Sequence, residues 1–247
     1  MDNVINELNN LLGWYRQVYG DIKYLDGKLE DPPARSEKPV VMEAPRVPVY
    51  KAPVKEAVVT HQKSPELEKF YLEIKDCSKC SLGETRKNFV FGVGNPKARI
   101  MFVGEAPGKE EDEKGIPFVG KAGKLLDKML ETIGLKRDDI YIANILKCRP
   151  PNNRDPRPDE VALCEPYLKK QLEMISPEIL VALGRISAQV LLKRNDSLSK
   201  LRQDIQIYED IPFVVTYHPA ALLRNPQWKR NAWQDLKKIK KLIEKTA

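Results

Sequence analysis

The sequence predicts an α/β fold with a mostly parallel sheet that helices cover on both faces. Short apolar runs, each long enough for one buried strand, recur from Pro65 onward, and stretches with helical spacing of apolar residues separate them. Strands buried on both faces are typical of parallel sheets whose connections are helices. The predicted strands are residues 98–104, 139–146, 178–183 and 212–217, and the predicted helices lie near residues 120–134, 158–175, 185–194 and 227–245.

The chain before this domain has a different character. Residues 1–30 are predicted to hold one amphipathic helix, because apolar side chains recur at helical spacing between Val4 and Val18. Residues 31–65 are rich in proline and contain no glycine, which is typical of an extended, semi-stiff linker. The helix either docks on the main domain, residues 66–247, or binds a protein partner.

Composition narrows the class of protein without naming a function. The formal net charge is +7 and the pI is about 9.1, which fits either an acidic partner or a lysine-rich solvated surface. No apolar run approaches the roughly 18 residues of a membrane span. The start of the chain, MDNVINELNN, lacks the apolar core of a signal peptide. We therefore expect an intracellular, cytoplasmic protein without membrane association.

The four cysteines suggest a metal or cluster site more than disulfides, given the expected compartment. Cys77 and Cys80 form a C-x-x-C motif, whereas Cys148 and Cys164 are separated by fifteen residues. Zinc ribbons usually present two tight pairs, while an iron–sulfur cubane tolerates one tight pair and two distant thiolates. The spacing favours the cluster over zinc and leaves four unrelated buried cysteines as a third possibility.

Unusual short motifs follow the four predicted strands. Functional loops of a parallel sheet gather at the carboxyl ends of its strands, so these motifs predict one site at that edge. From sequence context alone, Asn144 is a turn or capping residue, Phe118 a core residue and His218 a structural histidine at a strand end. The motifs are GEAPG at 104–108, NILKCRPP at 144–151, LGRIS at 183–187 and YHPAALLR at 217–224.

Three longer segments together change these interpretations. They read CSKCSLGETRKNFVFGVGNPKARIMFVGEAPGKEEDEKGIPFVGKAGKLLDKML, NILKCRPPNNRDPRPDEVALCEPYL and HPAALLR. In their order and spacing they closely resemble the family 4 uracil-DNA glycosylases, the iron–sulfur glycosylases of thermophilic bacteria and archaea. The resemblance covers roughly residues 66–245 and does not extend to the N-terminal helix and linker.

The resemblance implies a three-layer α/β/α sandwich around a four-stranded, mostly parallel sheet. It implies a [4Fe–4S] cluster on Cys77, Cys80, Cys148 and Cys164, with zinc as the alternative metal. It also implies hydrolysis of the N-glycosidic bond of deoxyuridine in single- and double-stranded DNA, which releases uracil and leaves an abasic site. We expect a monofunctional enzyme that acts as a monomer.

The resemblance assigns roles to three pocket residues. A base must be flipped out of the duplex before its edge can be read. The Asn144 amide matches the N3–H donor and O4 acceptor of uracil, and cytosine inverts that pattern. The Phe118 ring stacks on the base, and His218 stabilises the departing uracil anion at O2.

Other residues are assigned to DNA binding. Leu222 is the expected wedge that fills the space left by the flipped base, with Leu223 as the alternative. Arg224 is expected to hold a phosphate. The backbone amides at the helix start Gly184–Ser187, including those of Arg185 and Ser187, are expected to do the same.

One position departs from better-known uracil glycosylases. They carry an Asp where this chain has Ala106, and that Asp is thought to orient the attacking water. Water positioning therefore falls to Glu105, Glu111 or backbone carbonyls, with Glu105 as the first candidate and Glu111 as a weaker one. A dissociative mechanism asks least of a general base. A non-catalytic iron–sulfur or zinc DNA-binding module linked to replication is the competing function. The combination of Glu105, Phe118, Asn144 and His218 argues against it.

Overall fold

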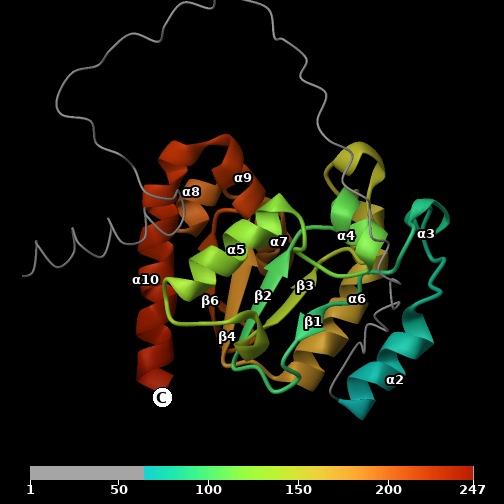
Figure 1. Ribbon diagram of the computed structural model, residues 1–247, viewed down its shortest axis with the longest axis horizontal. Helices are drawn as coiled ribbons and strands as arrows, with labels where there is room; N and C mark the ends of the chain where they lie inside the picture. The colour runs from blue at the N-terminus through green and yellow to red at the C-terminus, as the bar shows by residue number, and fades with distance from the viewer. Residues whose placement is uncertain (1–63, 247) are drawn as a thin grey trace, which may run out of the picture.

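The computed structural model describes residues 64–246 (Figure 1). The helix predicted for residues 1–30 lies outside the described residues, and so does the linker predicted for residues 31–65 up to residue 63. The first described helix, α2 (Pro65–Ile74), begins at a proline after Ser64, whose side chain caps the Leu67 amide.

The sheet has six strands in the order β1-β3-β2-β4-β6-β5. Its four central strands are mutually parallel and match the four predicted strands, so the parallel α/β core is confirmed: β2 (Ile100–Gly104), β3 (Tyr141–Asn144), β4 (Ile179–Leu183) and β6 (Ile211–Thr216). Two short antiparallel strands extend the edges, β1 (Val93–Gly94) beside β3 and β5 (Gln206–Tyr208) beside β6. The expected count of four strands therefore omitted both edges.

Alternate residues of each central strand face two separate apolar cores, which confirms the three layers. In β2, Met101 and Val103 belong to the core under α6 (Pro158–Ile175), whereas Ile100 and Phe102 belong to the core under α5 (Lys121–Glu131). Helices α2, α7 (Arg185–Leu192) and α8 (Leu198–Leu201) add to the first core. Helices α9 (Pro219–Arg224) and α10 (Lys229–Thr246) add to the second (Figure 1).

Short elements complete the described chain. They are α3 (Leu82–Thr85), α4 (Lys109–Lys114) and three 3₁₀ turns, η1 (Arg137–Asp139), η2 (Pro151–Asn153) and η3 (Pro226–Trp228). Between residues 64 and 246, none of the helices has the length and apolar character needed to cross a bilayer.

The parallel register brings the predicted motifs to one edge. Gly104 at the end of β2 is paired with Asn144 at the end of β3, and Leu183 at the end of β4 is paired with Thr216 of β6. The segments that leave these strands therefore lie side by side, as expected for a parallel sheet.

Candidate active site

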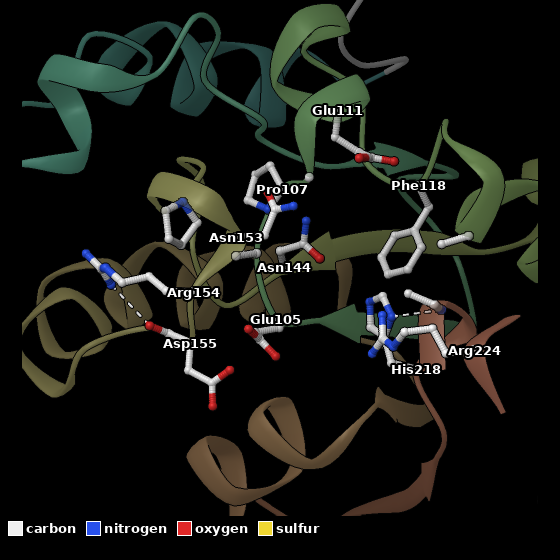
Figure 2. A pocket seen from close by; sticks show the side chains of 15 residues that line it. Glu105, Pro107, Glu111, Phe118, Asn144, Asn153, Arg154, Asp155, His218 and Arg224 are labelled. Carbon is white, nitrogen blue, oxygen red and sulfur yellow. Dashed lines mark hydrogen bonds between the residues drawn. The ribbon is translucent and has the colours of Figure 1, made fainter. Parts of the chain in front are cut away.

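A cavity of about 320 Å³ opens at this edge of the sheet (Figure 2). Its walls come from the segments after β2, β3 and β6 and from the loop that carries Phe118. Seven of the residues predicted for the site line it: Glu105, Ala106, Glu111, Phe118, Asn144, His218 and Arg224. The convergence of a carboxylate, an amide, an imidazole and an aromatic ring at one cavity is the arrangement expected of a binding or catalytic site.

The Asn144 side chain is the most informative group in the cavity. It is 2% exposed, and its Oδ1 atom has no hydrogen-bond partner among the described residues. Its backbone is held from behind, because the buried Lys147 Nζ donates to the Asn144 carbonyl at 3.0 Å and to Gln171 Oε1 at 2.5 Å. A buried polar atom without a partner is rare and costly, so the amide is arranged for a ligand that supplies the missing bond.

The His218 imidazole is held in one tautomer. The Ala220 amide donates to His218 Nδ1 at 3.2 Å, so the ring proton of the neutral form resides on Nε2. Burial, with the nearby Arg224 charge as a second cause, lowers the pKa of His218 to about 4. At neutral pH the residue is therefore an uncharged hydrogen-bond donor rather than an imidazolium acid.

Phe118 forms an aromatic wall of the cavity beside His218. The two ring centroids are 5.4 Å apart with an interplanar angle of 34°. A Cβ on Gly104 would lie 2.3 Å from Asn144 Oδ1 and 2.7 Å from the Phe118 ring, so only glycine allows this approach. The φ angle of Phe118 is +53°, a left-handed conformation that costs about 1–3 kcal/mol for a residue with a side chain.

Glu111 lines the cavity and also holds the loop that carries Phe118. Its Oε1 accepts hydrogen bonds from the amides of Val119 and Gly120, both at 3.0 Å. These amides lie at the start of α5, where an anion is favoured by the helix dipole. Glu111 therefore braces the loop that carries Phe118, and this occupation of its Oε1 weighs against the prediction that it positions water.

Glu105 stands at the other end of the cavity, near Asp155 (Figure 2). Burial is the main cause that raises the pKa of Glu105 to about 7, Asp155 adds to the rise and Arg185 opposes it. The neighbouring Ala106 also lines the cavity, and its methyl group cannot accept a hydrogen bond. Glu105 is thus a carboxyl group that changes protonation near neutrality, and no side chain between residues 64 and 246 forms a hydrogen bond or ion pair with it.

The loop after β3 supplies a wall that the sequence did not predict. Asn153, Arg154 and Asp155 line the cavity from this loop. Asn153 has a φ of +53° and its Oδ1 accepts from Arg149 Nε at 2.8 Å, while Arg154 is anchored to the buried Glu160 carboxylate. The prolines of RPPNNRDP marked this stretch as a turn, but nothing in the motif indicated the direction of the loop.

The residues predicted for DNA binding differ in how exposed their side chains are. Leu222 is completely buried in the core between α5 and α9, whereas the side chain of Leu223 is 44% exposed. A wedge must be free to enter a base stack, so these exposures favour the alternative, Leu223, over Leu222, and both assignments stay predictions. The Ser187 hydroxyl is also buried and donates to the Gly184 carbonyl, which leaves only backbone amides at this helix start. Arg185 is exposed and pairs with Asp155 at 3.3 Å.

The four cysteines lie at the edge of one apolar core, and none of them forms a disulfide. Electrostatic interactions link Cys148 to Cys164 and Cys80, and link Cys164 to Cys80 and Cys77. Burial raises the pKa of the Cys148 thiol to about 11. Three donors point at sulfur: Arg86 Nη1 to Cys148 at 3.4 Å, the Lys147 amide to Cys164 at 3.3 Å and the Tyr167 hydroxyl to Cys77 at 3.2 Å.

These features fit a thiolate-bound group in part. Positive charges of Arg86 and Lys147 beside desolvated thiols favour thiolates, and donors to sulfur are typical of iron–sulfur sites. As arranged in residues 64–246, no three His, Cys, Asp or Glu side chains form a group that holds a metal ion.

Comparison with known proteins identifies similar sequences. The family described as the uracil DNA glycosylase superfamily matches residues 91–237. A type-4 uracil-DNA glycosylase of Archaeoglobus fulgidus is 50% identical over 70% of this chain and 91% of its own length. Proteins of the same name are 48% identical in Sulfurisphaera tokodaii, over 71% of this chain and 84% of theirs, and 46% identical in Saccharolobus solfataricus, over 69% and 83%.

The tautomer and charge of His218 are open to direct measurement. In ¹⁵N-labelled protein carrying His61→Gln, a single imidazole remains, and its nitrogen shifts should show the Nε2–H tautomer at pH 7. Since burial and Arg224 disfavour the cation, the titration midpoint should lie near 4. A midpoint near the ordinary value of about 6.5, or the opposite tautomer, would contradict the arrangement described above.

Proposed function

This chain belongs to the type-4 uracil-DNA glycosylases of the uracil DNA glycosylase superfamily, and we infer that it removes uracil from DNA at the start of base excision repair. We propose hydrolysis of the bond between C1′ and N1 of deoxyuridine, in single- and double-stranded DNA, with water adding hydroxyl to the sugar. One observation carries this function best: Asn144, whose Oδ1 has no hydrogen-bond partner among the described residues, lines one cavity with the Phe118 ring and the His218 donor.

Recognition of uracil is proposed to depend on the unpaired amide. Asn144 Oδ1 accepts the N3–H of the flipped base, and the amide nitrogen donates to O4. Cytosine presents an unprotonated N3 and an amino group at those places. An amide whose backbone is fixed by Lys147 then leaves two mismatched polar pairs, so cytosine is rejected.

Cleavage is proposed to depend on His218. As the bond to C1′ breaks, negative charge spreads over the departing uracil, and the neutral Nε2–H donates to O2 where this charge develops. Because the pKa of His218 lies far below neutrality, the imidazole is neutral at pH 7. It then stabilises the anion through the Nε2–H hydrogen bond and not through a positive charge of its own. Arg224 at the same cavity adds positive potential for the anion.

Water capture is proposed to depend on Glu105. It lines the cavity next to Ala106, and its ionised carboxylate is able to accept a proton or a hydrogen bond from water. With charge already developed on the sugar, an oriented water needs little activation.

We propose that Cys77, Cys80, Cys148 and Cys164 hold a [4Fe–4S] cluster. The donor set of four sulfurs, with Arg86, Lys147 and Tyr167 directed at them, supports a thiolate-bound group. A cubane places its ligands around a larger object than a single zinc ion does, which suits the spread of these cysteines along the chain. When bound, the cluster supplies a rigid anchor for the segments that carry its ligands. Iron and sulfide analysis, set against zinc, decides between the two groups.

The function is tested by excision from oligonucleotides that contain one uracil. Purified full-length protein should release free uracil and leave an alkali-labile abasic site, and an otherwise identical cytosine or thymine strand should stay intact. Asn144→Leu removes the amide but keeps the volume, and should lower kcat/KM by at least about a hundredfold. Binding of the uracil strand without any release of base would favour the competing non-catalytic module.

A pH profile tests Glu105. Because the pKa of Glu105 is raised to about 7, its carboxylate is lost as the pH falls through 7, and kcat/KM should then fall about tenfold per pH unit. Glu105→Gln should lower the plateau and remove this limb between pH 5 and 8. If the variant kept the same acidic limb, the titrating group would be another one.

Duplex and single-stranded substrates separate the two leucines. Leu223→Ala should lower kcat/KM on duplex DNA about tenfold while excision from single strands changes little, because only a duplex has a base stack to fill. Leu222→Ala should instead destabilise the fold by about 2–5 kcal/mol in thermal or denaturant unfolding. The prediction fails if Leu223→Ala affects both substrates alike.

A further inference from the structure

The Phe118 ring depends on an unusual backbone that has to be held in place. At a φ of +53° a residue with a large side chain is an outlier, and such a conformation persists only where its surroundings impose it. Pro117 and Val119 flank it on the loop between α4 and α5. Whatever holds this loop therefore also sets the position of the aromatic wall.

Arg137 contacts the carbonyl side of this loop. From η1, its Nη2 donates to the Phe118 carbonyl at 2.6 Å and to the Pro117 carbonyl at 3.3 Å. The guanidinium also forms an ion pair with Asp127 of α5, whose Oδ1 lies 3.2 Å from Arg137 Nε, although the geometry of these two atoms is not that of a hydrogen bond. Arg137 does not line the cavity, so it is able to act on a bound base only through the loop.

The amide side of the loop and the helix beneath it complete the restraint. Glu111 Oε1 accepts from the Val119 and Gly120 amides, so opposite charges hold the amides and the carbonyls that flank Phe118. A Cβ on Gly123 would lie 1.7 Å from the Phe118 carbonyl oxygen, so α5 packs directly against this peptide. The Phe118 carbonyl and the Val119 amide, which belong to one peptide group, are thus held from both sides beside the left-handed Phe118.

We propose that Arg137, held by Asp127, is a positioning residue that keeps Phe118 in its left-handed conformation and so fixes the ring on which the base stacks. The inference rests on the uracil pocket proposed above. Arginine suits the role because its planar fork reaches two adjacent carbonyls and the carboxylate at once, and it stays charged at every working pH. Lysine is a point charge that satisfies only part of this geometry.

A double-mutant cycle tests the proposal on the full-length enzyme. Arg137→Gln should lower kcat/KM for a single-stranded uracil oligonucleotide by about tenfold to a hundredfold, because a displaced ring no longer supports the base. In a Phe118→Ala background the same substitution should have almost no further effect, since the ring through which Arg137 acts is absent. Full additivity of the two losses would overturn the proposal.

Matched variants separate positioning from general stability. Arg99→Gln breaks a surface ion pair with Glu178. Both residues directly precede central strands, at the ends of the strands far from the cavity, so kcat/KM should stay unchanged. Arg137→Lys should recover part of the lost activity. Free uracil should inhibit Arg137→Gln at least about tenfold more weakly than wild type, while affinity for abasic-site DNA is kept. Equal inhibition by uracil would overturn the proposal.

Three outcomes need separate interpretation. If Arg137→Gln does not fold, as judged by circular dichroism and thermal unfolding, the cycle with Arg137→Lys and Phe118→Ala decides by the same criterion of additivity. If the wild-type enzyme releases no uracil, the proposed function fails. If the wild type is active and Arg137→Gln behaves like Arg99→Gln, only the positioning role is wrong.

Discussion

The buried ammonium group of Lys147 joins the two functional parts of this molecule. Its Nζ donates to the carbonyl of Asn144 and to Gln171, and its own amide donates to the sulfur of Cys164. A charge in an apolar interior costs several kcal/mol unless it is compensated, and here the compensation comes from fixed oxygens and from sulfur. Asn144 and Cys148 stand on one short segment around this group. Lys147 therefore contacts both the backbone of the pocket residue Asn144 and the sulfur of Cys164.

The pocket is built from groups that are already in an unfavourable state before a ligand arrives. Asn144 Oδ1 lacks a partner among the described residues, and Phe118 has a left-handed backbone. Burial raises the pKa of Glu105 and lowers the pKa of His218, which favours the neutral form of each side chain. Each of these costs stability in the free protein. Together they mean that dipoles and donors need little rearrangement when charge develops on the departing base, which is how preorganised sites accelerate reactions.

The sequence predicted the parts of the structure that follow from long, regular patterns. The four central strands appeared as apolar runs, with Asn144 and His218 at the ends of two of them, and the helices α5, α6, α7 and α10 appeared as helical spacing of apolar residues. The helices α2, α8 and α9, which also contribute to the two cores, were not predicted. Strands β1 and β5 were missed because two or three residues are too few to show alternation. Adjacent leucines at 222 and 223 look alike in sequence, and only the rotation of α9 buries one of them. The Asn153 wall and the Glu111 brace depend on loop direction, which no periodicity encodes.

The order of the pocket residues along the chain has a consequence for how the protein is made. The cavity draws on positions from Glu105 to Arg224, and His218 follows β6, the last strand of the parallel core. All four cysteines come earlier, before β4 has been synthesised. A nascent chain therefore displays its complete set of thiols while it still lacks His218. If the proposed roles hold, the cysteines can receive their cluster before the donor to the departing base has been synthesised, and a product truncated after β4 keeps its cysteines without that donor.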